Sequence, residues 1–184
     1  MSNIIIGTAG HIDHGKTALI RALNGFEGDS TNEEKQRGIT IDLSFSNLTR
    51  AERNIAFIDV PGHEKLIKNM IAGAFGFDYV MLVVSAKEGL MPQTIEHIEI
   101  LSLLGIKNLI LVITKKDLVD EQTLKEQESK IVEFLDEFEF NIKFIKAVSI
   151  YDEKSIEDLK NSLFTISNST KTPENFFRFY VDRV

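Results

Sequence analysis

Eight residues near the N-terminus have the composition of a loop that binds phosphate. The segment 10–17 reads Gly-His-Ile-Asp-His-Gly-Lys-Thr, which matches the spacing Gly-x-x-x-x-Gly-Lys-Thr. Glycines let backbone N–H groups surround an anion, and a helix starting at Lys16 adds partial positive charge. Lys16 would reach the β- and γ-phosphates of a nucleotide, and the Thr17 hydroxyl would ligate Mg²⁺. The residues predicted to bind the phosphates are Gly10, His11, Ile12, Asp13, His14, Gly15, Lys16 and Thr17.

A second group of residues has the chemistry to hold the metal ion and to position water. The segment 59–63 reads Asp-Val-Pro-Gly-His and follows an apolar run, so Asp59 would hold Mg²⁺ through a water molecule. Gly62 has no side chain to keep its N–H from the γ-phosphate, and His63 stands where a residue that orients the attacking water is needed. Thr40, in a polar segment, would complete Mg²⁺ coordination when a γ-phosphate is present. We expect His63 to be catalytic and Thr17, Thr40 and Asp59 to bind Mg²⁺.

A third segment, 114–117, has side chains suited to reading a guanine base. It reads Thr-Lys-Lys-Asp at the end of an apolar run. The Asp117 carboxylate can accept hydrogen bonds from N1–H and the exocyclic amine of guanine, a donor pair that adenine lacks. Lys115 can lay its aliphatic stem along the base. Further along, the region of Ser149 and Ile150 follows another apolar run, and it can offer a backbone N–H to guanine O6.

The remaining histidine, His97, lies in a predicted helix away from these motifs. A single histidine in such a place is more often part of the core than of a site. We expect it to have a structural role.

The elements that must position these side chains follow from hydrophobic periodicity. Alternating strands and helices predict an α/β fold with right-handed crossovers. The short polar link 49–53 predicts an antiparallel hairpin. Together with the three motifs above, this pattern resembles the P-loop NTPase fold of the Ras-like G-domain type, which implies a mostly parallel six-stranded sheet, one antiparallel hairpin strand and helices on both faces. The predicted strands are 3–8, 41–48, 54–60, 79–84, 108–113 and 142–148, and the predicted helices are 16–24, 64–75, 92–104, 121–138 and 153–164.

The composition argues against several classes of protein. No apolar run approaches the roughly 20 residues of a membrane-spanning helix. The formal net charge of −7 is opposite in sign to the basic excess of proteins that grip nucleic acid over a wide surface. The absence of cysteine excludes disulfides and cysteine zinc sites, and it fits a reducing cytoplasm. We therefore expect a cytoplasmic protein with neither a membrane nor a DNA partner.

The C-terminal residues suggest a domain boundary. The segment 167–173 is rich in Ser, Thr and Asn and has the character of a linker, and 176–184 resumes a strand-like apolar pattern. We expect residues 1–172 to form one nucleotide-binding domain. Residues 173–184 are then a linker and the first strand of a second domain, and the chain is an N-terminal piece of a longer protein.

Together these motifs resemble the translational GTPase superfamily. The segments 10–17, 37–41 (Arg-Gly-Ile-Thr-Ile), 59–63 and 89–94 (Gly-Leu-Met-Pro-Gln-Thr) resemble the elongation factor Tu group. Three features are more similar to the selenocysteine-specific elongation factors. They are 7–10 (Gly-Thr-Ala-Gly), 40–45 (Thr-Ile-Asp-Leu-Ser-Phe) and Thr114, where most GTPases carry Asn. The terminal 177–184 resembles the first strand of that family's second domain, a β-barrel.

This resemblance implies an enzyme that binds GTP and GDP with Mg²⁺ and hydrolyses GTP when stimulated by the ribosome. It implies delivery of selenocysteinyl-tRNA to a UGA codon beside an mRNA hairpin, with both RNAs bound by domains outside this chain. It further implies a monovalent cation near Asp13 and an apolar gate of Ile12 and Ile39 beside His63. Ser149-Ile150 departs from the family's Ser-Ala.

Two other functions are compatible with the same motifs. One is a GTP-switched binding module with little turnover of its own, although His63 favours an enzyme. The other is a different translational GTPase, such as elongation factor Tu or the γ subunit of initiation factor 2. Thr114 and the Asp-Leu-Ser-Phe segment 42–45 favour the selenocysteine-specific family over these.

Overall fold

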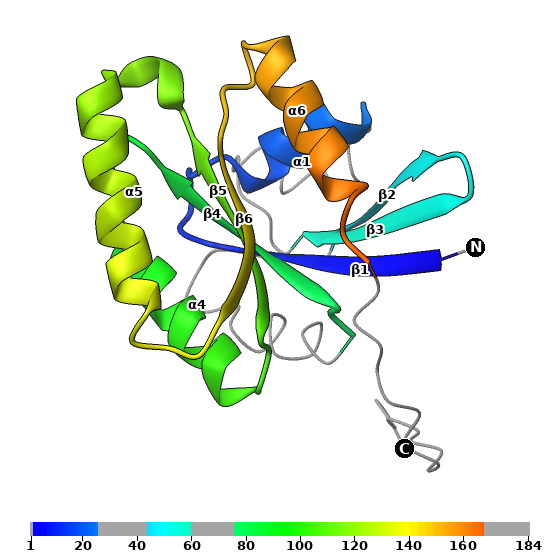
Figure 1. The fold of residues 1–184 in the computed structure, drawn as a ribbon, viewed down its shortest axis with the longest axis horizontal. Helices are drawn as coiled ribbons and strands as arrows, with labels where there is room; N and C mark the ends of the chain where they lie inside the picture. The colour runs from blue at the N-terminus through cyan, green and yellow to red at the C-terminus, as the bar shows by residue number, and fades with distance from the viewer. Residues whose placement is uncertain (1, 26–43, 60–75, 168–184) are drawn as a thin grey trace, which may run out of the picture.

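A single twisted sheet organises the part of the chain that the computed structural model describes, residues 2–25, 44–59 and 76–167. Within these residues the sheet has six strands in the order β2-β3-β1-β4-β5-β6 (Figure 1). Every neighbouring pair is parallel except β2 and β3, which are antiparallel. The predicted sheet is therefore confirmed. Its strands are β1 (Ser2–Ala9), β2 (Ser44–Arg50), β3 (Arg53–Asp59), β4 (Tyr79–Ser85), β5 (Asn108–Thr114) and β6 (Asn141–Ala147).

Helices cover both faces of this sheet, as the sequence predicts (Figure 1). Helices α1 (Lys16–Asn24) and α6 (Glu153–Leu163) pack on one face. Helices α4 (Pro92–Leu103) and α5 (Glu121–Leu135) pack on the other, and a short 3₁₀ helix, η2 (Lys116–Leu118), follows β5. Among the described residues, no helix is long and apolar enough to cross a membrane.

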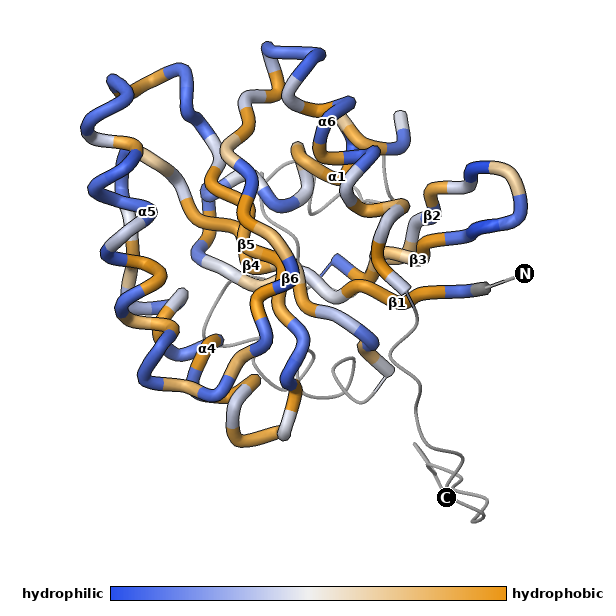
Figure 2. The backbone as a smooth tube through the Cα atoms, in the orientation of Figure 1, coloured by the Kyte–Doolittle hydropathy of each residue, from blue (hydrophilic) through white to orange (hydrophobic). Residues whose placement is uncertain are grey.

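The central strands are apolar along their whole length because both of their faces are covered. In β5, Leu109, Leu111 and Ile113 belong to the core beneath α4 and α5. Ile110 and Val112, which alternate with them, belong to the core beneath α1 and α6. The same strands form the hydrophobic centre of the tube in Figure 2. This explains why the sequence shows unbroken apolar runs here instead of a period of two.

The largest differences from the predicted boundaries are at the hairpin turn and at the end of α5. The hairpin turn is shorter than the predicted link 49–53, because Arg50 pairs directly with Arg53 and only two residues lie between the strands. Polar residues continue the strands here because the outer faces of an edge strand meet water. Helix α5 ends at Leu135, three residues earlier than predicted, and the N–H of Phe138 then donates to the Leu135 carbonyl in a turn.

Several predicted segments lie outside the described residues. They are the polar segment 28–39, the start of the second predicted strand (41–43), the helix 64–75 and the linker and strand at 173–184.

The fold determines where the motifs lie relative to one another. Ala9, Asp59, Thr114 and Ala147 end parallel strands, so the loops that follow them share one edge of the sheet, which is where α/β folds bind ligands.

Candidate nucleotide-binding site

The segment Gly10–Gly15 connects β1 to α1 in a conformation that needs glycine at both ends. Gly10 has φ 131°, and a Cβ there would lie 2.1 Å from the carbonyl oxygen of Val83. Gly15 has φ 86° immediately before α1. Gly15, the N-cap residue, makes no side-chain hydrogen bond to this helix, and the first N–H groups of a helix have no acceptor within the helix itself. This is the geometry of an anion site at a helix N-terminus.

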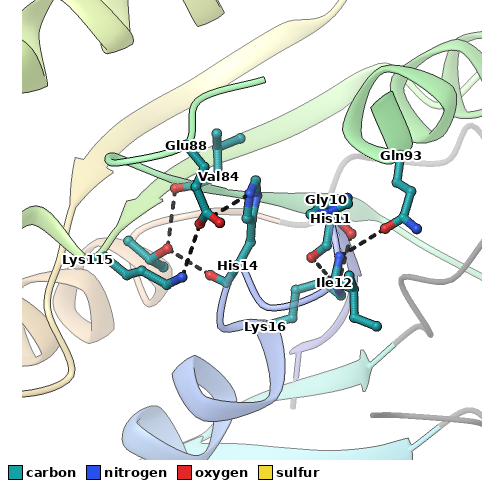
Figure 3. Close-up of polar contacts among 10 residues, drawn as sticks. Gly10, His11, Ile12, His14, Lys16, Val84, Glu88, Gln93 and Lys115 are labelled. Carbon is teal, nitrogen blue, oxygen red and sulfur yellow. Dashed lines mark hydrogen bonds and ion pairs between the residues drawn. The ribbon is translucent and has the colours of Figure 1, made fainter. Parts of the chain in front are cut away.

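Lys16 lies folded back over this loop. Its Nζ donates to the carbonyl oxygens of Gly10 and His11, each at 2.9 Å, and the residue is only 7% exposed (Figure 3). Burial lowers the pKa of Lys16 to about 8, and the nearby carboxylates of Asp59 and Asp13 act in the opposite direction. A cation held by the carbonyl oxygens of its own loop is well placed to meet a phosphate that enters the loop.

Asp59 lies where the second motif requires it, next to the start of α1. Its Oδ2 accepts a hydrogen bond from Thr17 Oγ1 at 2.6 Å. Its Oδ1 accepts one from Thr8 Oγ1 at 2.7 Å. The Asp59 carboxylate and the Thr17 hydroxyl therefore place oxygen atoms next to each other, and oxygen is the type of ligand that Mg²⁺ prefers.

These two residues fit a nucleotide-bound Mg²⁺ better than a metal held by protein alone. Within the described ranges no group of three or more His, Cys, Asp or Glu side chains could hold a metal ion. Magnesium usually keeps several waters and takes one or two protein oxygens together with substrate phosphates. Thr17 would supply an oxygen directly and Asp59 would hold the ion through a water molecule, and the ion would neutralise phosphate charge.

Thr114 joins the predicted base-reading segment to the phosphate loop. Its buried hydroxyl donates to the carbonyl oxygen of His14 at 2.7 Å, with a longer contact of 3.3 Å to the Val84 carbonyl. Lys115 follows in a left-handed conformation with φ 57°, and its Nζ lies 3.1 Å from Glu88 Oε2. Figure 3 shows Glu88 between Lys115 and His14. The two halves of the site are thus connected within the described structure.

The loops after β5 and β6 are held side by side at the same edge. The Lys116 N–H donates to the Val148 carbonyl at 3.3 Å, and Lys116 Nζ lies 2.7 Å from Asp152 Oδ2. Asp117, in η2, is exposed, and so is Ile150. A base that lies between these loops would contact both Asp117 and Ile150.

Ser149 has more internal partners than the sequence suggested. Its N–H donates to Ser155 Oγ at 3.2 Å, and its Oγ accepts from the Tyr151 N–H at 3.2 Å. Ser155 also donates to the Ser149 carbonyl, so the serine pair shapes the turn. The contact of this region with guanine O6 stays a prediction.

His97 contacts the phosphate loop, although the sequence placed it away from every motif. Its Nδ1 accepts a hydrogen bond from the Gly10 N–H at 3.0 Å, and the side chain is 1% exposed. One helical turn earlier, Gln93 Oε1 accepts from the Ile12 N–H at 3.1 Å. Burial lowers the pKa of His97 to about 4, which keeps the ring neutral and able to accept. Two features of the sequence could have indicated this contact. Segment 89–94 resembles the elongation factor Tu group, and the i, i+4 spacing puts Gln93 and His97 on one face of their helix.

The side chains of the two histidines of the loop contact each other. The rings of His11 and His14 meet edge to face with centroids 5.1 Å apart. Burial lowers the pKa of His14 to about 4, so it is neutral at pH 7. The 3.8 Å between His14 Nε2 and Glu88 Oε2 is too long for a hydrogen bond. His14 thus contributes through its backbone carbonyl, which Thr114 binds.

Three predicted site residues lie outside the described residues. They are Thr40, Gly62 and His63. The structure brings together the phosphate loop, Thr17, Asp59 and the segment that begins at Thr114.

Comparison with known proteins gives this arrangement a family context. The sequence profile described as Elongation factor Tu GTP binding domain matches residues 1–169. The Selenocysteine-specific elongation factor of Desulfomicrobium baculatum is 46% identical over 185 residues, covering 98% of this chain and 29% of that protein. The crystal structure of a bacterial selenocysteine-specific elongation factor, EF-Sec, matches with a TM-score of 0.84 and 45% identity, covering 93% of this chain and 30% of that one.

A second type of translation factor is also similar. The Translation initiation factor 2 subunit gamma of Thermococcus onnurineus is 39% identical over 157 residues, covering 73% of this chain and 38% of that protein. The chain spans 29–38% of the length of these relatives.

Proposed function

Because the chain belongs to the family of elongation factor Tu GTP-binding domains, we propose that it is the nucleotide switch of a factor that delivers selenocysteinyl-tRNA to the ribosome. The domain binds guanine nucleotide, and GTP hydrolysis to GDP and phosphate is the reaction expected of it. The higher identity and fuller coverage of the selenocysteine-specific relatives, compared with the initiation factor subunit, support the choice of tRNA.

The hydrogen bond from Thr114 to the His14 carbonyl carries the proposal. It joins the segment that would read the base to the loop that would hold the phosphates, so a single ligand with both parts can occupy the edge of the sheet. It is also made by a threonine, the residue that distinguishes this segment from the common Asn. Asp117 then selects guanine because it accepts from two donors that adenine does not offer.

Each predicted site residue has a place in this proposal. His63 would orient the attacking water, and Gly62 would approach the γ-phosphate. A monovalent cation beside Asp13 would add positive charge near the phosphates. The residues proposed to hold Mg²⁺ are Thr17, Thr40 and Asp59, the last through a water molecule. The proposed nucleotide contacts are Gly10, His11, Ile12, Asp13, His14, Gly15, Lys16, Thr17, Thr114, Lys115, Asp117, Ser149 and Ile150.

The partners of the whole factor belong to the same proposal. The ribosome would stimulate hydrolysis in the cytoplasm, and domains after about residue 172 would bind the tRNA and an mRNA hairpin. DNA and membranes have no part in it. The acidic charge of −7 agrees with RNA contacts that lie mainly in those other domains.

Two experiments test the proposal, the first for the choice of nucleotide and the second for the choice of tRNA. This chain should bind a fluorescent GDP analogue, and unlabelled GTP but not ATP should displace it. The full-length factor with a non-hydrolysable GTP analogue should protect selenocysteinyl-tRNA from deacylation and should leave initiator methionyl-tRNA unprotected. Displacement by ATP would refute the guanine assignment.

The same measurements separate the alternatives. Protection of initiator tRNA would favour a factor related to the initiation factor subunit. Single-turnover hydrolysis that ribosomes do not accelerate would favour a GTP-switched binding module. Replacing potassium by sodium should slow hydrolysis if a cation sits beside Asp13.

A further inference from the structure

Thr8, in β1, contacts Asp59, the carboxylate proposed to hold Mg²⁺. The proposed function gives Thr8 no role. The register of β1 and β3 pairs Gly7 with Ile58, so Thr8 and Asp59 are the next residues on the two parallel strands. Thr8 is 1% exposed and Asp59 is 3% exposed. The hydrogen bond between Thr8 Oγ1 and Asp59 Oδ1 is 2.7 Å long and buried.

The two oxygens of this carboxylate have different neighbours. Oδ1 accepts from Thr8, on a buried strand, and Oδ2 accepts from Thr17, in the first turn of α1, at 2.6 Å. The χ2 torsion of an aspartate is intrinsically broad. Donors from two separate elements therefore constrain the plane of this carboxylate.

We propose that Thr8 is a positioning residue for Mg²⁺, because its hydroxyl holds Oδ1 of Asp59 and thereby directs Oδ2 toward Thr17. The inference rests on the nucleotide and Mg²⁺ binding proposed above. Residues that hydrogen-bond a metal-binding carboxylate typically change metal affinity 10–100-fold when they are lost. Thr8 is buried and would act on the ion only through Asp59, so its effect should appear only when Mg²⁺ is present.

The test compares Thr8→Val, which keeps the branched shape but removes the hydroxyl, with Thr8→Ser, which keeps the hydroxyl. The release of a fluorescent GDP analogue is measured from excess chelator to saturating Mg²⁺. In Thr8→Val the Mg²⁺ concentration that half-maximally slows release should rise about tenfold or more. In Thr8→Ser it should stay close to wild type. In chelator all three proteins should release GDP at the same rate.

Thr94→Val is a matched control of the same chemistry. Thr94 is fully buried, and its Oγ1 has no hydrogen-bond partner within the described part of the chain. This substitution should leave the Mg²⁺ midpoint unchanged.

Three results would overturn the inference. One is an unchanged Mg²⁺ midpoint in Thr8→Val. The second is faster GDP release to the same extent with chelator and with Mg²⁺, which would mean that Thr8 supports the loop and not the metal. The third is an equal shift in Thr94→Val.

Failure of this inference can be told from failure of the proposed function. If Thr8→Val does not fold, Thr8→Ala is measured in its place with the same expected shift. Mn²⁺ binding to the GDP complex, followed by electron paramagnetic resonance, gives a second readout of the same affinity. Retained GDP binding with an unmoved midpoint refutes only the role of Thr8, whereas absence of GDP binding by the wild-type chain refutes the function itself.

Discussion

Raising the pH above 8 should weaken GDP binding through Lys16. In the structure, burial lowers the pKa of Lys16 to about 8, and Asp59 and Asp13 offset this only in part. A bound diphosphate would bring negative charge to Nζ and raise that pKa again. The complex therefore favours protonated Lys16, and affinity falls as the pH rises through 8.

The magnitude follows from this pKa if Lys16 stays charged in the complex. At pH 8 about half of Lys16 is neutral in the free protein, so binding there should take up about half a proton. The dissociation constant should rise about fourfold between pH 7 and pH 8.5. The free energy of unfolding of the ligand-free protein should change in the opposite direction, because an unfolded lysine keeps its proton up to a pKa of about 10.4. Weaker binding at high pH is then not a sign of unfolding.

Calorimetric titration of the chain with GDP, in buffers of different ionisation enthalpy, measures the proton uptake directly. Lys16→Arg is the matched control, because a guanidinium stays charged throughout this range. Whatever the affinity of this variant, its proton uptake should be close to zero. Two results would refute the reasoning: no proton uptake by the wild-type chain at pH 8, or equal uptake by Lys16→Arg.

Four further predictions concern single side chains. Thr114→Val removes the hydrogen bond to the phosphate loop and should speed GDP release roughly twofold to tenfold, the equivalent of about 0.5–1.5 kcal/mol; an unchanged stopped-flow rate would show that the bond is dispensable. His97→Ala leaves the buried Gly10 N–H unpaired and should lower the free energy of unfolding by about 1–3 kcal/mol in chemical denaturation. Asp117→Asn should shift preference from GTP toward XTP in competition binding, because Asn can donate to the xanthine carbonyl. His63→Ala should keep GTP affinity within a few-fold and slow ribosome-stimulated single-turnover hydrolysis by about 100-fold or more; an unchanged rate would remove His63 from the catalytic step.

The parts of the site that could be predicted from the sequence are those whose chemistry is contiguous. The residues from Gly10 to Thr17 carry glycines, a cation and a hydroxyl at fixed spacing, and the structure places them in the loop after β1 and the first turn of α1, as that spacing requires. Asp59 and Thr114 were also predictable, because each ends an apolar strand and the ends of parallel strands share one edge. The six strands and the one antiparallel hairpin were predictable from the alternation of apolar runs and helical periodicity.

Contacts that cross the fold could not be predicted in this way. His97 lies 87 positions from Gly10, and a buried histidine in a helix gives the same periodic signal whether it packs in the core or binds a loop. The two roles can be told apart only in the folded structure, where the crossover from β4 to α4 brings the N-terminal half of α4 against the phosphate loop. Thr8 is similar, since a threonine in a strand is unremarkable until the register places it beside Asp59.

The way the two halves of the site are joined argues for rapid nucleotide exchange. Within the described residues the phosphate loop and the base-side segment share one short hydrogen bond, from Thr114 to His14. The Lys115–Glu88 pair beside it is about one-third exposed on both sides, and pairs that meet water contribute ~0–1 kcal/mol. Loop and base segment can therefore separate at the cost of about one hydrogen bond. The helix contacts made by Gln93 and His97 hold the loop to the body of the domain and not to the base side. We therefore expect GDP to leave quickly without an exchange factor. We also expect Thr114→Asn, which offers an amide in place of one hydroxyl, to slow its release.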